Sequence, residues 1–282
     1  MNKLFFLSVT TYTAAIVGLA EDVAALRWYH TIDLPGGVVT PGFFDTRAAA
    51  TAIPLPESLE GKRCLDVGTS DGFWAFEMER RGAAEVVAID LPDPASRDLT
   101  RVGERDRKII DPERKSRTFG LVHDALGSRV KRQELSVYDL SPEQTGTFDF
   151  VFMGSILVHL RDPVAAIARV RSVTEGQLLS YEAVSLMLSI LHPRTAAAIL
   201  RGLGRAEWWL PNKTGLRQMI RAGGFDIVGA GPVSFVKRRD RKLNLQRLRK
   251  RPLGNIVLAA RGIAQSWVLA RPGSTTMAGA VH

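Results

Sequence analysis

The stretch KRCLDVGTSDGFWAFEMERRGAA, residues 62–84, decides the fold of this chain. Its pattern predicts a buried strand over residues 63–67, a tight glycine turn over 68–72 and an amphipathic helix over 73–81. A strand that runs through a glycine turn into a helix is the arrangement with which α/β proteins hold a nucleotide-like ligand. Glycine lacks a Cβ, so the backbone of such a turn can bend sharply and approach a ligand closely.

Two acidic residues bracket the turn. Asp66 lies at the end of the first predicted strand, and Asp90 ends the next one. Asp90 comes about 20 residues after the turn, where a carboxylate can accept hydrogen bonds from both hydroxyls of a ribose. The run G-T-S-D-G has Ser70 where a dinucleotide site has its second glycine, so a pyrophosphate cradle is not favoured. The alternative interpretation is a doubly wound sheet with no ligand at the turn.

Composition places the chain among ordinary globular proteins, because 45% of its 282 residues are hydrophobic and 24% are charged. The single cysteine, Cys64, falls inside the first predicted strand, so a disulfide framework or a cysteine-rich zinc site is excluded. We therefore expect a cytoplasmic protein without a structural metal. Residues 4–20 are apolar but broken by hydroxyl side chains and are short for a membrane span, which favours an N-terminal helix or extension over an export signal.

The positive charge of the chain is concentrated in one segment. The formal net charge is +9, and the segment KRRDRKLNLQRLRKR, from Lys237 to Arg251, carries +8 of it. Such a segment attracts an RNA backbone or a phosphorylated acceptor. Its leucines also allow a surface helix that docks on the core or on a membrane face, and a merely solvated loop is the third possibility.

The rest of the chain continues as alternating strands and helices, which is typical of an α/β protein. We predict a Rossmann-like sheet of seven strands over residues 63–67, 85–89, 130–137, 147–153, 177–182, 225–230 and 254–262. Helices are predicted over residues 119–126, 163–172 and 214–222, and residues 91–117 are predicted to be a solvated loop or a short charged helix. The expected organisation is an N-terminal helical and irregular extension over 1–45, a domain over 46–262 that includes the basic connection 237–252, and a disordered tail over 263–282.

With these pieces placed, LDVG-x-x-x-G followed by VVAID resembles the class I methyltransferases that use S-adenosylmethionine (SAM). The segments FDFVFMGSILVHLRDP and WWLPNKTGLRQMIRAGGF are similar to those of the tRNA wobble-uridine (5-oxyacetic/methoxyuridine) methyltransferase-like family. This resemblance implies SAM as the methyl donor, bound by the domain over residues 46–262. The residues that it implies for SAM binding are Asp66, Gly68, Thr69, Ser70, Gly72, Phe73, Asp90, Leu91, Tyr138, Asp139 and Gly154. For Asp139, which would meet the adenine, the alternative is a cap for the turn over residues 141–144.

One departure from that family bears on the donor. Wobble-uridine enzymes that use a carboxylated SAM carry a tyrosine immediately before the loop histidine and a lysine upstream. Here Val158 precedes His159, and no lysine occurs between Lys3 and Lys62. A valine cannot hold a carboxylate, so ordinary SAM and methyl transfer are expected.

Transfer of a methyl group to a hydroxyl needs a base close to the acceptor. His159 is the first candidate because it follows the central strand, Glu182 is the second and His30 is the third. A histidine that only fixes the loop is the alternative for His159, and one that satisfies local backbone groups is the alternative for His30. We expect a SAM-dependent methyltransferase that acts on a hydroxyl of a small molecule or sugar. The alternatives are a tRNA methyltransferase and a non-catalytic nucleic-acid-binding protein on the same scaffold.

Overall fold

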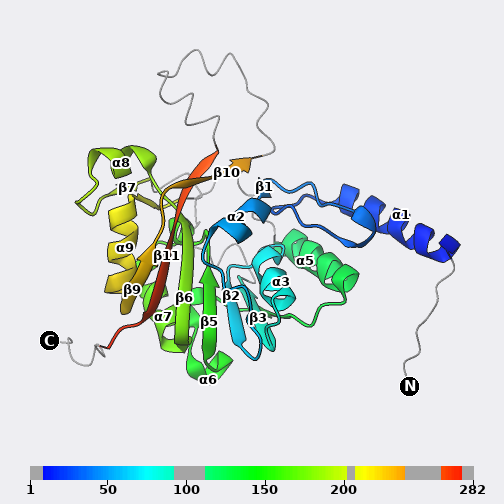
Figure 1. Cartoon of the computed structure of the whole chain (residues 1–282), viewed down its shortest axis with the longest axis horizontal. Coiled ribbons are helices and arrows are strands. Elements are labelled where there is room, and N and C mark those ends of the chain that lie inside the picture. Colours follow the sequence, from blue (N-terminus) through cyan, green and yellow to red (C-terminus); the bar gives the residue numbers. More distant parts are fainter. Residues whose placement is uncertain (1–8, 92–111, 202–206, 239–261, 275–282) are drawn as a thin grey trace, which may run out of the picture.

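The computed structural model describes residues 9–91, 112–201, 207–238 and 262–274 (Figure 1). Its helices are α1 Val9–Ala25, α2 Arg47–Ala52, α3 Phe73–Arg80, α5 Pro112–Leu126, α6 Pro142–Thr145, α7 Pro163–Val173, α8 Leu186–Leu191 and α9 Lys213–Ala222, with short 3-10 turns η1 Pro35–Gly37, η3 Val137–Asp139 and η4 Leu157–His159. Its strands are β1 Phe44–Asp45, β2 Arg63–Val67, β3 Glu85–Asp90, β4 Lys131–Glu134, β5 Phe148–Met153, β6 Thr174–Ala183, β7 Ala198–Leu200, β8 Trp209–Pro211, β9 Phe225–Ala230, β10 Ser234–Arg238 and β11 Ile263–Pro272.

The main sheet has a parallel half and an antiparallel half. Strands β4, β3, β2, β5 and β6 run parallel in that order. Strand β11 then pairs antiparallel with β6, and its other edge is shared by β9 and β10. With β1 on β10, nine strands of the described chain form this sheet, so the Rossmann-like prediction is confirmed and the sheet is larger than the seven strands expected.

Apolar side chains cover both faces of the sheet, as expected for parallel strands buried on two sides. Side chains alternate along a strand, so that Phe150 and Phe152 point to one core while Val151 and Met153 point to the other. The first core is closed by α3 and α5, and the Trp74 ring of α3 stacks on Phe152 with centroids 4.2 Å apart. The second core is closed by α7 and α9, which lie on the opposite side (Figure 1).

The last strand of the sheet lies elsewhere than the sequence predicts. Of the predicted strand 254–262, residues 254–261 lie outside the described residues, and the closing strand is β11, over 263–272. The prediction of a disordered tail is therefore wrong for these residues. The polar pair Gln265 and Ser266 makes the segment resemble a tail, but both side chains are buried. Ser266 donates to the carbonyl of Gly231, and Gln265 donates to the hydroxyl of Ser155.

The N-terminal segment is part of the packed domain. Trp28, Ile32, Leu34 and Phe44 join the core that α3 and α5 close. In Figure 1 this segment, with β1 and α2, lies toward the carboxyl ends of the parallel strands, while α6 lies at their opposite ends. No helix of the described residues is long and apolar enough to cross a membrane. Beyond β10, the predicted basic connection lies outside the described residues.

Candidate active site

The glycine turn leaves β2 and enters α3 through left-handed backbone conformations. Gly68, Ser70 and Gly72 have φ angles of 80°, 51° and 92°. A Cβ added to Gly72 would meet the Phe76 ring at 2.3 Å and the Phe119 ring at 2.9 Å, so glycine is required there. Ser70 is the one non-glycine residue with positive φ in the described chain, at a cost of about 1 kcal/mol. The predicted strand, turn and helix are confirmed.

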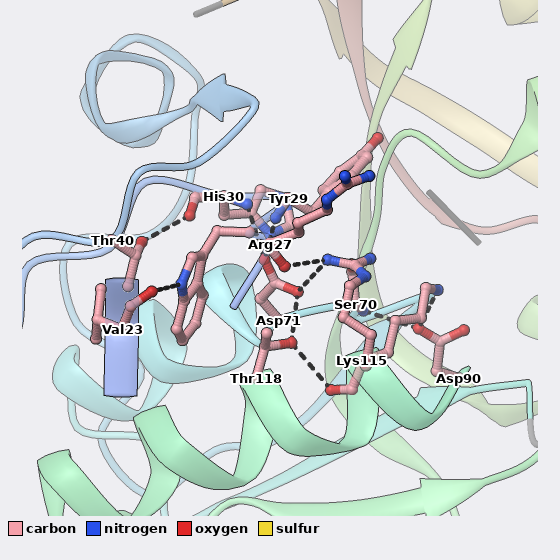
Figure 2. Close-up of polar contacts among 12 residues, drawn as sticks. Val23, Arg27, Tyr29, His30, Thr40, Ser70, Asp71, Asp90, Lys115 and Thr118 are labelled. Atoms are coloured by element: carbon pink, nitrogen blue, oxygen red, sulfur yellow. Dashed lines mark hydrogen bonds and ion pairs between the residues drawn. The ribbon is translucent and has the colours of Figure 1, made fainter. Parts of the chain in front are cut away.

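Asp90 folds back onto this turn. One of its carboxylate oxygens accepts the backbone N–H of Ser70 at 2.9 Å, and the other accepts that of Leu91 at 2.8 Å. The Lys115 ammonium of α5 lies 2.6 Å from the oxygen that Ser70 contacts, and both side chains are buried (Figure 2). The acid that the sequence singled out thus lies at the turn, as expected, with a lysine that the sequence analysis did not identify.

Asp66 is buried beside the same turn, with 1% of its surface exposed. Burial raises the pKa of its carboxyl to about 7, although the nearby Thr69 hydroxyl opposes the shift and Asp90 adds to it. Within the described residues, Asp66 Oδ2 and Ser70 Oγ have no hydrogen-bond partner. Buried polar atoms without partners are costly, so the turn suits a polar ligand that would satisfy them.

Asp71 is the most heavily bonded residue of the turn, and the sequence analysis missed it. Its buried carboxylate accepts the backbone N–H groups of Tyr29 and His30 and the hydroxyl of Thr118 (Figure 2). The Arg114 guanidinium lies 3.8 Å away. Asp71 therefore joins the N-terminal segment, the turn and α5.

Helix α5 begins earlier than the predicted residue 119, inside the segment 91–117 that was predicted to be a solvated loop or a short charged helix. Four side chains of this helix are buried: Lys115, and the residues three, four and seven positions after it, which are Thr118, Phe119 and Val122. This spacing marks one helical face. The spacing was visible in the sequence, but the surrounding arginines and acids obscured it.

His30 is a buried residue of the N-terminal segment and does not lie in an open site. Its side chain is 4% exposed, its ring centroid lies 5.7 Å from that of Phe73, and Nδ1 has no hydrogen-bond partner in the described chain. Burial lowers the pKa of its imidazole to about 4; Asp71 opposes this shift, and Lys115 and Arg114 add to it. His30 is therefore a neutral imidazole near neutral pH.

The loop after β5 carries His159 and packs against the turn. A Cβ on Gly154 would meet the carbonyl oxygen of Tyr181 at 2.4 Å, so the loop lies directly on β6. Ile156 of the loop would lie 3.0 Å from a Cβ added to Gly68 of the turn. His159 ends η4 and is half-buried.

Glu182, at the end of β6, holds this loop. Its two carboxylate oxygens accept the backbone N–H groups of Ile156 at 3.2 Å and Leu157 at 3.1 Å. The side chain is fully buried, and burial raises the pKa of the carboxyl to about 8, although the two N–H groups oppose the shift. Glu182 thus holds the loop at Ile156 and Leu157, which precede His159 by three and two residues.

The tryptophan pair and Tyr138 also contact this loop. Trp208 donates its backbone N–H to Val158 at 2.7 Å, and the Trp209 indole donates to the carbonyl of Arg161 at 3.0 Å. The hydroxyl of Tyr138 accepts the N–H of Asp162 at 3.1 Å. The two segments that resemble one methyltransferase family thus lie against each other.

Asp139, which follows Tyr138, is exposed at the end of η3. Helix α6 begins after Ser141, which is its N-cap residue, so the alternative that Asp139 caps this turn is wrong. Within the described residues, no group of three or more His, Cys, Asp or Glu side chains is arranged to hold a metal ion.

The parallel sheet in the order β4-β3-β2-β5-β6, with antiparallel β11 beside β6 and an acid folded onto a glycine turn, defines a class I methyltransferase fold. The family described as "Methyltransferase domain" matches residues 45–229, and the chain belongs to that family. The matched segment is therefore a methyltransferase domain.

Curated relatives carry the name ubiquinone biosynthesis O-methyltransferase. One from Xanthomonas oryzae pv. oryzae is 35% identical over 151 residues, which are 53% of this chain and 51% of that protein. One from Xanthomonas campestris pv. campestris is 31% identical over 193 residues, 67% of this chain and 66% of that protein. The chain thus spans about half the length of the first of these relatives, and their name comes from quinone biosynthesis, not from tRNA modification.

Solved structures share the fold at low identity. The N-terminal domain of EvdMO1 with S-adenosylhomocysteine bound is 14% identical with a TM-score of 0.56, covering 92% of this chain and 97% of that one. The [4+2]-cyclase SpnF is 17% identical with a TM-score of 0.51, covering 92% and 94%. These likenesses show the fold alone.

Proposed function

We propose that the protein is an O-methyltransferase that transfers the methyl group of SAM to a hydroxyl of a small molecule. The observation that carries this proposal is the hydrogen bond from the Ser70 N–H to the Asp90 carboxylate, which lies at the glycine turn and would there accept the ribose hydroxyls of SAM. The name of the curated relatives supports oxygen as the acceptor atom.

In this proposal the residues predicted to bind SAM contact three different parts of it: the ribose, the adenine and the methionine end. Asp90 would accept the ribose hydroxyls, and Leu91, Tyr138 and Asp139 would surround the adenine. The methionine end would lie along the turn, contacting Asp66, Gly68, Thr69, Ser70, Gly72, Phe73 and Gly154. The partnerless buried oxygens of Asp66 and Ser70 support this arrangement, because a polar ligand would satisfy them.

The three candidate bases receive different roles. SAM supplies a sulfonium methyl that is already a strong electrophile, so the protein mainly has to position the reactants. His159 would take the proton of the acceptor hydroxyl as the O–CH₃ bond forms and the S–CH₃ bond breaks. Glu182 would position the loop of His159, since both of its oxygens hold loop N–H groups. His30 would belong to the wall of the site, because burial leaves its imidazole a weak base.

A His159→Ala variant tests the function and the base together. Radiolabelled SAM is supplied with a panel of phenols, catechols and sugar alcohols. The wild type should methylate at least one of them, and the variant should lose about 100-fold or more in kcat, the range typical of a general base. Its affinity for S-adenosylhomocysteine should stay at the wild-type value.

The exposed His192, at the end of α8, provides the matched control. His192→Ala should keep full activity. An unchanged kcat in the His159→Ala variant would show that His159 is not the base. Failure of the wild type to methylate any hydroxyl would contradict O-methylation itself.

The RNA alternatives have less support. The basic segment from Lys237 to Arg251 would be their working surface, and most of it lies outside the described residues. The curated relatives are named for ubiquinone biosynthesis. A tRNA substrate, a non-catalytic role in nucleic-acid binding and the cytoplasmic location therefore stay predictions, and methylation of tRNA in the same assay would favour the first of them.

A further inference from the structure

One face of α5 contacts two carboxylates of the turn region, those of Asp90 and Asp71. Lys115 contacts Asp90 at 2.6 Å, and Thr118, about one helical turn later, donates to Asp71 at 2.8 Å (Figure 2). All four side chains are buried. The position of Asp90 therefore depends on how α5 is docked, and the Asp71–Thr118 hydrogen bond is one of the contacts that dock it.

The N-terminal segment is held at the same point. The other carboxylate oxygen of Asp71 accepts the N–H groups of Tyr29 and His30, which precede it by more than 40 residues. Arg114 of α5 donates to the carbonyl of Arg27 at 2.6 Å and approaches Asp71 to 3.8 Å. The N-terminal segment and α5 thus both contact the turn through this one carboxylate, and they contact each other through Arg114 and Arg27.

We propose that Asp71 is a positioning residue for the cofactor site: it holds residues 27–30 and α5 against the glycine turn, and thereby sets Asp90 in place for the ribose of SAM. This inference rests on the proposed binding of SAM at the turn. A fully buried carboxylate that accepts three donors is a strong geometric constraint, because charge-assisted hydrogen bonds are the strong ones.

The chain allows a conservative variant that separates geometry from charge. In Asp71→Asn, the amide oxygen can still accept from Tyr29 and His30. The amide nitrogen can donate to the Thr118 hydroxyl, whose own proton can turn to the carbonyl of Lys115, 3.2 Å away. Asp71→Ala removes every one of these contacts.

The test is calorimetric titration of each variant with S-adenosylhomocysteine, combined with amide hydrogen exchange. Asp71→Ala should raise the dissociation constant about tenfold, the equivalent of one lost hydrogen bond to a charged group. The amides of Tyr29 and His30 should lose protection in the same variant. Asp71→Asn should stay within about threefold of the wild type and keep both amides protected.

Asp149 provides the control for general destabilisation. Its carboxylate accepts the backbone N–H of Arg63 at 2.8 Å, at the amino ends of β5 and β2 and away from the turn. Asp149→Ala should bind S-adenosylhomocysteine as the wild type does. If Asp71→Ala does not fold, Thr118→Val addresses the same contact, with a dissociation constant raised about threefold.

The outcomes separate this inference from the proposed function. A wild type that does not bind S-adenosylhomocysteine contradicts SAM binding itself. A wild type that binds, with Asp71→Ala or Thr118→Val binding equally well, overturns the role of Asp71 alone. Equal loss in Asp71→Ala and Asp71→Asn would also overturn it, because geometry would then not be what Asp71 supplies.

Discussion

At the scale of the residue, the fold changes the acid–base chemistry of Glu182. Burial raises the pKa of its carboxyl from 4.5 to about 8. Between these two values the folded protein keeps a proton that the unfolded chain has released. The stability therefore falls as the pH rises through this window, and the full loss is present above the folded pKa.

Glu182→Gln should remove this dependence. The variant loses one acceptor for the loop at every pH, but its free energy of unfolding should fall less than that of the wild type between about pH 5 and pH 8.5. The slopes should differ by about 1.4 kcal/mol per pH unit, so that the extra loss in the wild type totals several kcal/mol across the window. Urea unfolding at intervals across this range measures it.

The exposed Glu60 is the control, and Glu60→Gln should keep the wild-type slope. The shifts of Asp66 and His30 are present in both proteins and cancel in the comparison. Parallel curves for the wild type and Glu182→Gln would show that the carboxyl is ionised in the folded protein across this range.

The same scale shows what the sequence could predict of the site. Asp66 and Asp90 were predicted because each ends an apolar strand, and strand ends meet at one edge of a parallel sheet. Asp71 was missed because its partners are 41 residues back and 47 residues ahead. A contact between distant segments leaves no local pattern in a single sequence.

At the scale of the element, the glycine turn has a left-handed backbone and lies close to the loop that carries His159. Gly68 has φ of 80°, and an added Cβ would lie 3.0 Å from Ile156. Gly61, just before β2, has φ of 71° and nothing within 4 Å of an added Cβ. An alanine at either position should cost about 1 kcal/mol of stability, because both are in left-handed conformation.

Only Gly68→Ala should also weaken binding of S-adenosylhomocysteine, by about tenfold or more. The methyl group of the new alanine would occupy the space between the turn and the loop after β5 that contains η4 and His159 (the η4 loop). Calorimetry of the two variants side by side measures this difference. Equal affinity in Gly68→Ala and Gly61→Ala would mean that the turn is not where the ligand approaches the backbone.

Elements were predictable where one pattern dominated. Strands β2 and β9 have the predicted bounds, and β3 and β5 differ from theirs by one residue, because these are apolar runs bounded by turns. Strand β11 was missed because Gln265 and Ser266 interrupt its apolar run and are buried with partners of their own. Buried polar pairs of this kind are recognised only when the partners are known.

At the scale of the whole molecule, the candidate site is assembled from four separated parts of the chain. The N-terminal segment, the glycine turn, α5 and the η4 loop come together at the carboxyl ends of the parallel strands (Figure 1). Such edges are where open α/β sheets bind ligands. The class of the fold was therefore predictable from β2 and β3, whereas the walls of the site depended on tertiary packing.

The most direct measurement is a crystal structure of the protein with S-adenosylhomocysteine. Our account predicts that the ribose hydroxyls lie within hydrogen-bond distance of the Asp90 carboxylate and that the sulfur faces the η4 loop with His159. A nucleoside bound away from the turn, or a turn filled by protein side chains with no ribose hydroxyl near the Asp90 carboxylate, would contradict it.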